Sequence, residues 1–190
     1  MLVLFNKPYG VLSQFTSDGG KWRTLAEYVS IPDVYAAGRL DADSEGLLLL
    51  TDHGALQSAI AGAQSRVTKT YHVQVEGTAT PEQVATLARG VALNDGMTRP
   101  AKCQLLPDAV EPWPREPPIR VRKSVPDSWI ELTISEGRNR QIRRMTAAVG
   151  LPTLRLIRVA IGPWRADGIA LGEMRVIPDD AAFAALRAKS

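Results

Sequence analysis

Apolar residues recur along the chain in short runs, and the spacing within each run predicts a strand or a helix. Residues 69–76 and 129–135 alternate apolar and polar side chains, which is typical of strands with one buried face. The four leucines 47–50 are continuous, which fits a strand buried on both faces or a buried helical segment. Because the run is short and ends at Thr51-Asp52, we favour a strand. Further strands are predicted at residues 2–5, 34–40, 101–106, 153–161 and 173–177.

Helical spacing and capping residues predict four longer helices. The segment 53–62 ends at a glycine, and Thr80-Pro81-Glu82 opens the next helix with a cap and a proline in its first turn. A basic helix is predicted at 138–149, and a last one at 180–188. A shorter helix follows Thr24, where Glu27 completes a capping box. Because several loops are too short for parallel crossovers, we expect an α+β fold with a mixed, largely antiparallel sheet flanked by helices.

The 190 residues predict a single catalytic domain over 1–190, with possible subdomains 1–62 and 63–190. Between two predicted strands, residues 107–126 are rich in proline and arginine, and we expect an extended, mobile loop there. Its residues 112–123 are a candidate for substrate-specific contact. Cys103 is the single cysteine and the histidines show no ligand spacing, so no metal site is predicted. Without a signal peptide or an apolar run of membrane length, we expect a cytoplasmic protein.

The acidic segment 38–52, GRLDADSEGLLLLTD, is the first candidate for chemistry. Its carboxylates lie in the turn before the leucine run. An ordinary acidic turn on the solvated surface, without a catalytic role, would have the same composition. Arg39 lies two positions before Asp41, and a strongly basic helix about a hundred residues later could face the turn. The net charge is only +3, but basic residues concentrate at 115–123 and 138–158. A basic surface with one acidic patch suits a polyanionic partner that must bring one group to a carboxylate.

The basic helix has two distinct faces. Ile142, Met145 and Val149 share one face, and arginines occupy much of the other, as in any amphipathic helix with a solvated side. However, Arg138 and Arg140 lie at the helix N-terminus, where a cation opposes the macrodipole. This placement indicates that they meet an anion, either a phosphate or a carboxylate. Tyr71 is inward-facing on its strand and fits either the core or a binding role.

Four segments, in order, resemble a known family. NKPYGVLSQF at 6–15, GRLDADSEGLLLLT at 38–51, KTYHVQV at 69–75 and EGRNRQIRRM at 136–145 are similar to the motifs of the RsuA/RluB/RluE/RluF family of pseudouridine synthases, which act on ribosomal RNA. Residues WPREPPIRVRKS and LPTLRLIR are most similar to members that modify the large subunit. The chain resembles the catalytic core of the family, without the N-terminal S4 RNA-binding domain of many members.

The resemblance implies a role for four residues. Asp41 matches the single catalytic aspartate of the family, and Tyr71 matches the tyrosine that packs against the target base. Arg138 matches the basic residue that pairs with the catalytic carboxylate, and Ile142 matches an apolar position of the uracil pocket. Asp43 and Glu45 are not implicated as catalysts.

The implied reaction converts uridine to pseudouridine in 23S ribosomal RNA, by breaking the N1–C1′ bond and joining C5 to C1′. Nothing is oxidised and nothing leaves, so we expect no cofactor. The carboxylate could attack C1′ or remove a ribose proton, and the target base must flip out of the RNA. The partner would be 23S rRNA or a large-subunit assembly intermediate, bound by a monomer. Predicted phosphate ligands are Lys7, Arg39, Arg140, Arg143 and Arg144.

Two other functions fit parts of the pattern. The basic surface alone would suit a non-catalytic rRNA-binding module for ribosome assembly. A pair of carboxylates, Asp41 with Asp43 or Glu45, would suit a glycoside hydrolase. That reading ranks last, because carboxylates of one loop rarely straddle a substrate and the basic surface would have no role.

Overall fold

The computed structural model describes residues 1–107, 113–119 and 124–188, and the chain divides into two compact units. The first contains residues 1–67 and 158–190, and the second contains residues 68–157. The first unit is therefore discontinuous in sequence, since the C-terminal segment returns to it. The predicted break near residue 62 lies close to the observed one, but the return of residues 158–190 was not predicted. A single catalytic domain stays a prediction.

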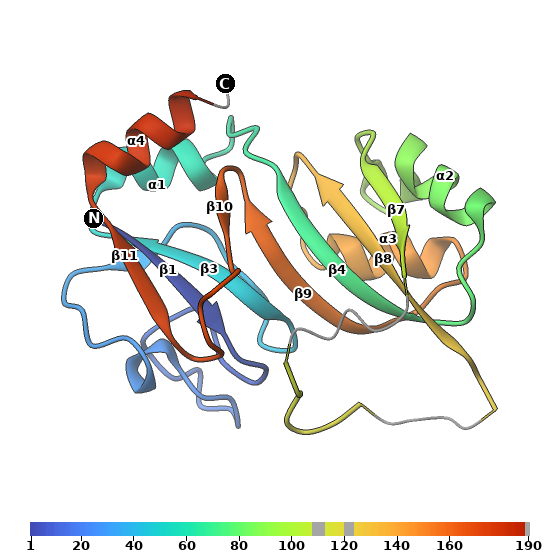
Figure 1. Ribbon diagram of the computed structural model, residues 1–190, viewed down its shortest axis with the longest axis horizontal. Helices are drawn as coiled ribbons and strands as arrows, with labels where there is room; N and C mark the ends of the chain where they lie inside the picture. Colours follow the sequence, from blue (N-terminus) through green and yellow to red (C-terminus); the bar gives the residue numbers. More distant parts are fainter. Residues whose placement is uncertain (108–112, 120–123, 189–190) are drawn as a thin grey trace. The chain divides into compact units, whose positions relative to one another are not determined.

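The first unit is built on antiparallel pairs around strand β3 (Glu45–Thr51). The strand order is β11-β1-β3-β9, with β2 on β3 and β10 on β9 (Figure 1). Leu4 of β1 lies opposite Leu49 of β3. The other elements are β1 (Leu2–Lys7), the 3-10 helix η1 (Leu25–Glu27), β2 (Tyr35–Ala36), α1 (Gly54–Ala61), β9 (Thr153–Ile161), β10 (Trp164–Arg165), β11 (Met174–Ile177) and α4 (Asp179–Arg187).

The leucine run of β3 is buried on both faces, as predicted. One face, with Leu47 and Leu49, packs in a core to which helices α1 and α4 contribute Leu56 and Ala182. Leu48 and Leu50 point to the opposite face and are also fully buried. At about 25 cal/mol per Å² of apolar surface, burial of each leucine stabilises the fold by about 1.5–3 kcal/mol. The strand therefore gives a rigid base for the acidic turn that precedes it.

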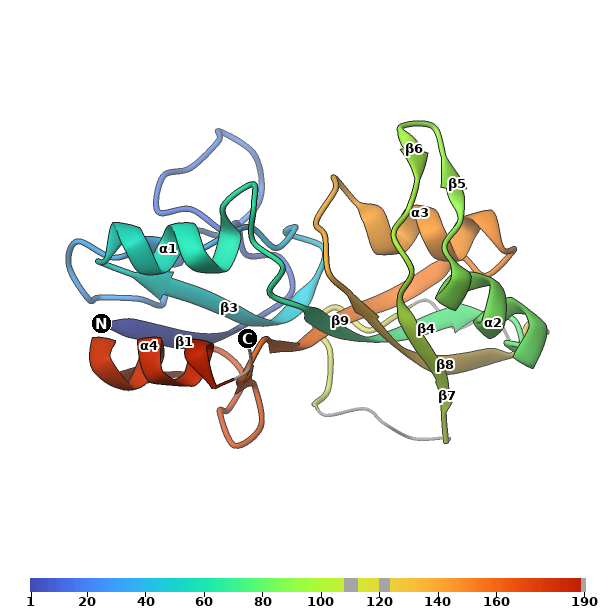
Figure 2. The same cartoon turned by 90° about the horizontal axis from the view of Figure 1, so that it is seen from above.

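The second unit carries strands in the order β9-β4-β8-β7, and the β4–β8 and β7–β8 pairs are antiparallel. Strand β9 contributes its first residues, 153–157, to this unit and its last to the first unit. A small β5–β6 hairpin contacts helix α3 and projects beside it (Figure 2). The elements are β4 (Lys69–Glu76), α2 (Pro81–Arg89), β5 (Ala92–Leu93), β6 (Gly96–Met97), β7 (Lys102–Leu106), β8 (Asp127–Ile134) and α3 (Gln141–Ala148).

The structure confirms the α+β class with its largely antiparallel pairing, and most predicted elements are found. The basic helix is an exception at its start: it begins at Gln141 instead of 138, because Arg140 is left-handed with φ 47°. Strand 34–40 is reduced to Tyr35–Ala36. Of the predicted loop 107–126, residues 108–112 and 120–123 lie outside the described residues. Among the described helices, none is long and apolar enough to cross a membrane.

Candidate active site

Asp41 opens a tight turn between β2 and β3 in the first unit. Its carbonyl accepts a hydrogen bond from the Ser44 N–H at 3.0 Å, which closes a four-residue turn. The Asp41 side chain is half-buried, whereas Ser44 and Glu45 are buried at the start of β3. Asp41 therefore lies in a turn just before the first residue of a fully buried strand.

Residues of the first predicted motif hold the backbone on both sides of Asp41. The buried Ser13 hydroxyl donates to the Leu40 carbonyl at 2.6 Å and accepts from the Leu40 N–H at 3.0 Å. The Gly10 N–H donates to the Ala42 carbonyl at 2.7 Å. Because both neighbours of Asp41 are tied to the segment 10–13, the position of its Cα is strongly constrained.

Arg158 of β9 contacts the same loop. Its Nε donates to the Leu47 carbonyl at 2.7 Å and its Nη1 to the Arg39 carbonyl at 3.1 Å. Sequence reasoning missed both Ser13 and Arg158. A signal for Arg158 was present, since a charged residue stands in the middle of the apolar segment 153–161.

Lys7 is fully buried, and its ammonium group donates to the carbonyls of Pro8 and Val11 at 2.9 and 2.8 Å. Burial, followed by repulsion from Arg158, lowers the pKa of Lys7 to about 7, against the opposing attraction of the loop carboxylates. A buried ammonium with these partners does not suit the predicted phosphate contact, so the placement supports an internal role instead. Lys7 and Arg158 are thus two buried basic residues close to the acidic loop.

Tyr71 and Ile142 belong to the second unit. Tyr71 lies on β4 opposite Leu132 and is buried on the same face as Val73 and Val75. Ile142 is buried in the first turn of α3. Both placements agree with the inward orientation predicted from spacing, while their contact with a uracil base stays a prediction.

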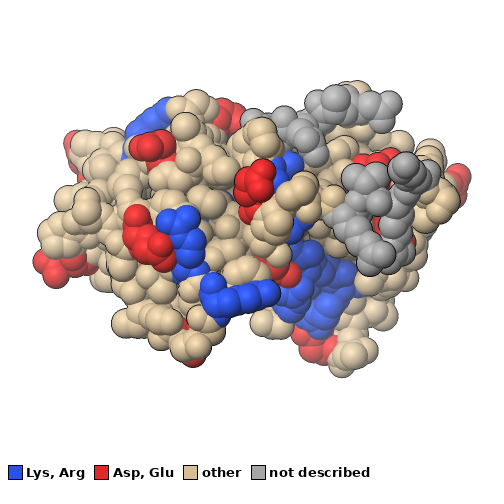
Figure 3. Space-filling model, turned by 90° about the horizontal axis from the view of Figure 1, so that it is seen from below, with Lys and Arg blue, Asp and Glu red and all other residues tan. Residues whose placement is uncertain are grey.

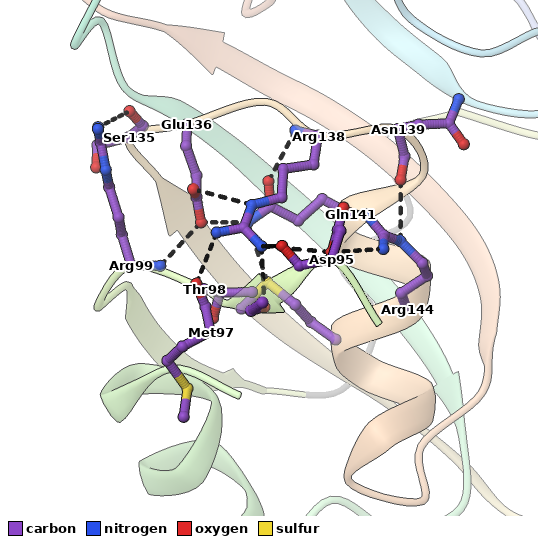
Figure 4. A network of polar contacts seen from close by, with 12 residues as sticks. Asp95, Met97, Thr98, Arg99, Ser135, Glu136, Arg138, Asn139, Gln141 and Arg144 are labelled. Atoms are coloured by element: carbon purple, nitrogen blue, oxygen red, sulfur yellow. Dashed lines mark hydrogen bonds and ion pairs between the residues drawn. The ribbon is translucent and has the colours of Figure 1, made fainter. Parts of the chain in front are cut away.

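Arg138 precedes α3, and its guanidinium group holds the β5–β6 hairpin (Figure 4). Its Nη1 donates to the Gly96 carbonyl at 2.9 Å, and its Nη2 to the Met97 carbonyl at 2.6 Å. Its Nη1 also lies 3.3 Å from an Asp95 carboxylate oxygen, and its Nε lies 3.3 Å from Glu136. The three guanidinium nitrogens are therefore engaged inside the second unit, and pairing with Asp41 stays a prediction.

Arg144 reinforces the same contact. Its two terminal nitrogens donate to the two Asp95 carboxylate oxygens at 2.9 and 3.0 Å, a bidentate geometry. The hydrogen bonds and charge of Arg144 lower the pKa of Asp95 to about 2. Arg144 was predicted to bind phosphate, and in the structure its guanidinium group is engaged by a carboxylate.

The other predicted basic ligands differ in exposure. Arg39 and Arg140 are exposed, and Arg143 is half-buried. On the face shown in Figure 3, lysine and arginine side chains gather into a patch bordered by acidic side chains. Phosphate contact by these arginines stays a prediction. Within residues 1–107, 113–119 and 124–188, no three potential ligands among His, Cys, Asp and Glu cluster as a metal site would require.

Comparison with known proteins gives consistent matches over most of the chain. Residues 1–148 match the family model described as RNA pseudouridylate synthase. The chain is 64% identical over 172 residues to "Ribosomal large subunit pseudouridine synthase E" of Xanthomonas axonopodis pv. citri, covering 90% of each chain. The protein of the same name from Vibrio vulnificus is 49% identical, over 93% of this chain and 74% of that protein. A solved structure described as a pseudouridylate synthase aligns with a TM-score of 0.78 at 29% identity, covering 97% of this chain and 73% of that one.

Proposed function

The chain belongs to the RNA pseudouridylate synthase family, and from this membership we propose that it modifies one uridine of 23S ribosomal RNA with Asp41 as the catalytic carboxylate. The family and its named relatives make the protein an RNA uridine-to-pseudouridine isomerase, as the motifs predicted. The large-subunit substrate is supported by the names of relatives that are 49–64% identical. We further propose that the enzyme acts as a cytoplasmic monomer.

The geometry of the Asp41 loop is the observation that carries the catalytic assignment. Asp41 is half-buried, and the backbone groups of Leu40 and Ala42 on either side are fixed by hydrogen bonds from Ser13 and Gly10. A carboxylate held on a constrained turn at the end of a packed strand meets the positioning requirement of catalysis, where small displacements are costly. Asp43, two residues further along the turn, has no matching role in the family motif.

The reaction requires a group that acts at the ribose end of the target nucleotide. Asp41 could attack C1′, which forms a covalent glycosyl intermediate, or remove the C2′ proton, which starts an elimination. In either route the N1–C1′ bond breaks, the uracil turns, and C5 bonds to C1′. In the first route the Asp41–C1′ bond breaks as C5 bonds to C1′, and in the second route C2′ regains its proton. The C5 proton then leaves and N1 gains a proton, so atoms balance without an oxidant or a cofactor.

The family motifs also imply which residues contact the target base. We propose that Tyr71 stacks on the flipped uracil, a contact worth about 1–3 kcal/mol, and that Ile142 lines the pocket. Exposed Arg39 and Arg140 would contact phosphates, which gives affinity that falls with salt but reads little sequence. We also propose that Arg138 pairs with the catalytic carboxylate, as the family motif implies.

Pseudouridine mapping of 23S rRNA tests this proposal in cells. A strain without the protein should lack one pseudouridine that the wild type contains, and the wild-type gene should restore it. The Asp41→Asn variant, produced at equal level, should not. An unchanged map in the deletion strain would contradict the substrate assignment. A site restored fully by Asp41→Asn would contradict the catalytic assignment and favour the non-catalytic rRNA-binding function.

A further inference from the structure

We propose that Arg158 is a positioning residue for Asp41, which acts by fixing the two ends of the loop 39–47. The inference rests on the proposed function, because it concerns how Asp41 is presented to the RNA. Arg158 does not itself need to touch the substrate. Arg158 is only 4% exposed and lies within the same compact unit as the loop.

The hydrogen bonds of Arg158 join two points that bracket the aspartate. Arg39 lies two residues before Asp41, and Leu47 is the third residue of β3. One planar group donates to the carbonyls of both, at 3.1 and 2.7 Å. Since the guanidinium is rigid, it sets the separation between the loop's entry and its exit into the strand.

Gly46 gives independent support for a close fit between β9 and the end of the loop. Its φ is +100°, and a Cβ added there would lie 2.3 Å from the Arg158 carbonyl oxygen and 2.9 Å from the Arg158 nitrogen. Only glycine tolerates both the conformation and the approach. The backbone of Arg158 is thereby held directly against the residue that precedes Leu47.

Local stability alone does not explain a cation at this position. Nη2 of Arg158 is buried and has no hydrogen-bond partner among the described residues. The neighbouring buried cation, Lys7, is repelled by Arg158. Burial of a charged group whose hydrogen-bonding capacity is only partly met is costly. Arg158 therefore lowers the stability of the fold through its unpaired Nη2, while its other two nitrogens fix the loop of Asp41. This combination is typical of functional sites, where the position of a catalytic group is maintained at the expense of stability.

The expected consequence is a defect in turnover with little change in RNA affinity. Arg158→Met keeps the volume of the side chain but removes the donors, so the loop ends are no longer joined. Arg158→Lys keeps the charge but loses the planar fork. Displacement of a catalytic group by about 1 Å can cost about a hundredfold in rate. We therefore expect kcat to fall about tenfold to a hundredfold for Met and less for Lys, with KM changed by less than about threefold.

Val159→Ala is the matched control. Val159 is the next residue on β9, is 5% exposed, and points to the opposite face of the strand. Its truncation should lower the melting temperature by loss of packing while kcat stays within about twofold of wild type. A fall in kcat specific to the Arg158 variants is then not a general effect of destabilisation.

The experiment combines steady-state kinetics on a 23S rRNA fragment with hydrogen–deuterium exchange of the full chain. Faster exchange of the loop amides 40–47 in Arg158→Met, but not in Val159→Ala, together with the kcat defect supports the proposal. Wild-type kcat in Arg158→Met, a loss confined to KM, or unchanged exchange in the loop would overturn it. If Arg158→Met does not fold, Arg158→Lys carries the same comparison. An inactive wild-type protein would instead contradict the proposed function, and the exchange arm would still test the contact.

Discussion

Lys7 is buried inside the first unit among the carbonyls of its own turn, and this placement makes stability depend on pH. Its pKa falls from 10.5 to about 7 on folding, mainly through burial. Between these two values the unfolded chain binds more protons than the folded protein. The free energy of unfolding therefore rises with pH through this window, and the unfavourable contribution of the buried charge is fully present below pH 7.

Lys7→Met should remove this pH dependence. From about pH 7 to 10, the unfolding free energy of the wild type should rise relative to that of Lys7→Met, by at most about 1.4 kcal/mol per pH unit. Urea unfolding of both proteins across this range measures the difference. Lys102→Met replaces an exposed lysine and should follow the wild type. Parallel curves for the wild type and Lys7→Met would show that Lys7 does not titrate in this window.

At the residue scale, sequence reasoning could find Asp41 because it lies in a recognisable motif. It assigned Lys7 to phosphate binding and did not identify Ser13 or Arg158, because the contacts of these residues depend on partners that only folding brings close. Arg158 and the Arg39 carbonyl are 119 positions apart in sequence. A lysine in a turn predicts solvent exposure on average, and only the packing of β1 shows that this one is buried.

The β5–β6 hairpin is the element whose position depends most on arginines. Arg138 donates to its carbonyls, and Arg144 binds Asp95 through two parallel hydrogen bonds. Sequence patterns predicted neither strand, because each is only two residues long and shows no periodicity. The sequence predicted a catalytic carboxylate as the partner of Arg138 and phosphate as the partner of Arg144, and it did not predict the contact of either arginine with Asp95.

Arg144→Met should loosen the hairpin. We expect faster hydrogen–deuterium exchange of amides 92–99, since the bidentate contact to Asp95 is lost. Arg89→Met is the control, because Arg89 ends α2 in the same unit and donates to Thr86. Hairpin exchange that is equal in Arg144→Met and in the wild type would contradict the clamping role. That result would favour phosphate binding as the role of Arg144.

At the scale of the whole molecule, alternation and capping predicted the class and most elements, since these depend on local periodicity. The return of residues 158–190 to the first unit was beyond such patterns. Strand β9 is one continuous strand, yet its residues 153–157 belong to one unit and 158–161 to the other. The loop 39–47 and Arg158 come from distant parts of the sequence, and both belong to the unit that carries Asp41.

The most direct test of the account is single-turnover pseudouridine formation by purified Asp41→Asn and Asp43→Asn, with a 23S rRNA fragment labelled at uridine C5. Release of the C5 label reports the reaction, and a separate binding assay reports RNA affinity. Asp41→Asn should lose at least about a thousandfold in rate while affinity is retained. Asp43→Asn, in the same turn, should stay within about tenfold of the wild type. Equal losses in the two variants, or an active Asp41→Asn protein, would contradict the assignment of Asp41 as the catalytic carboxylate.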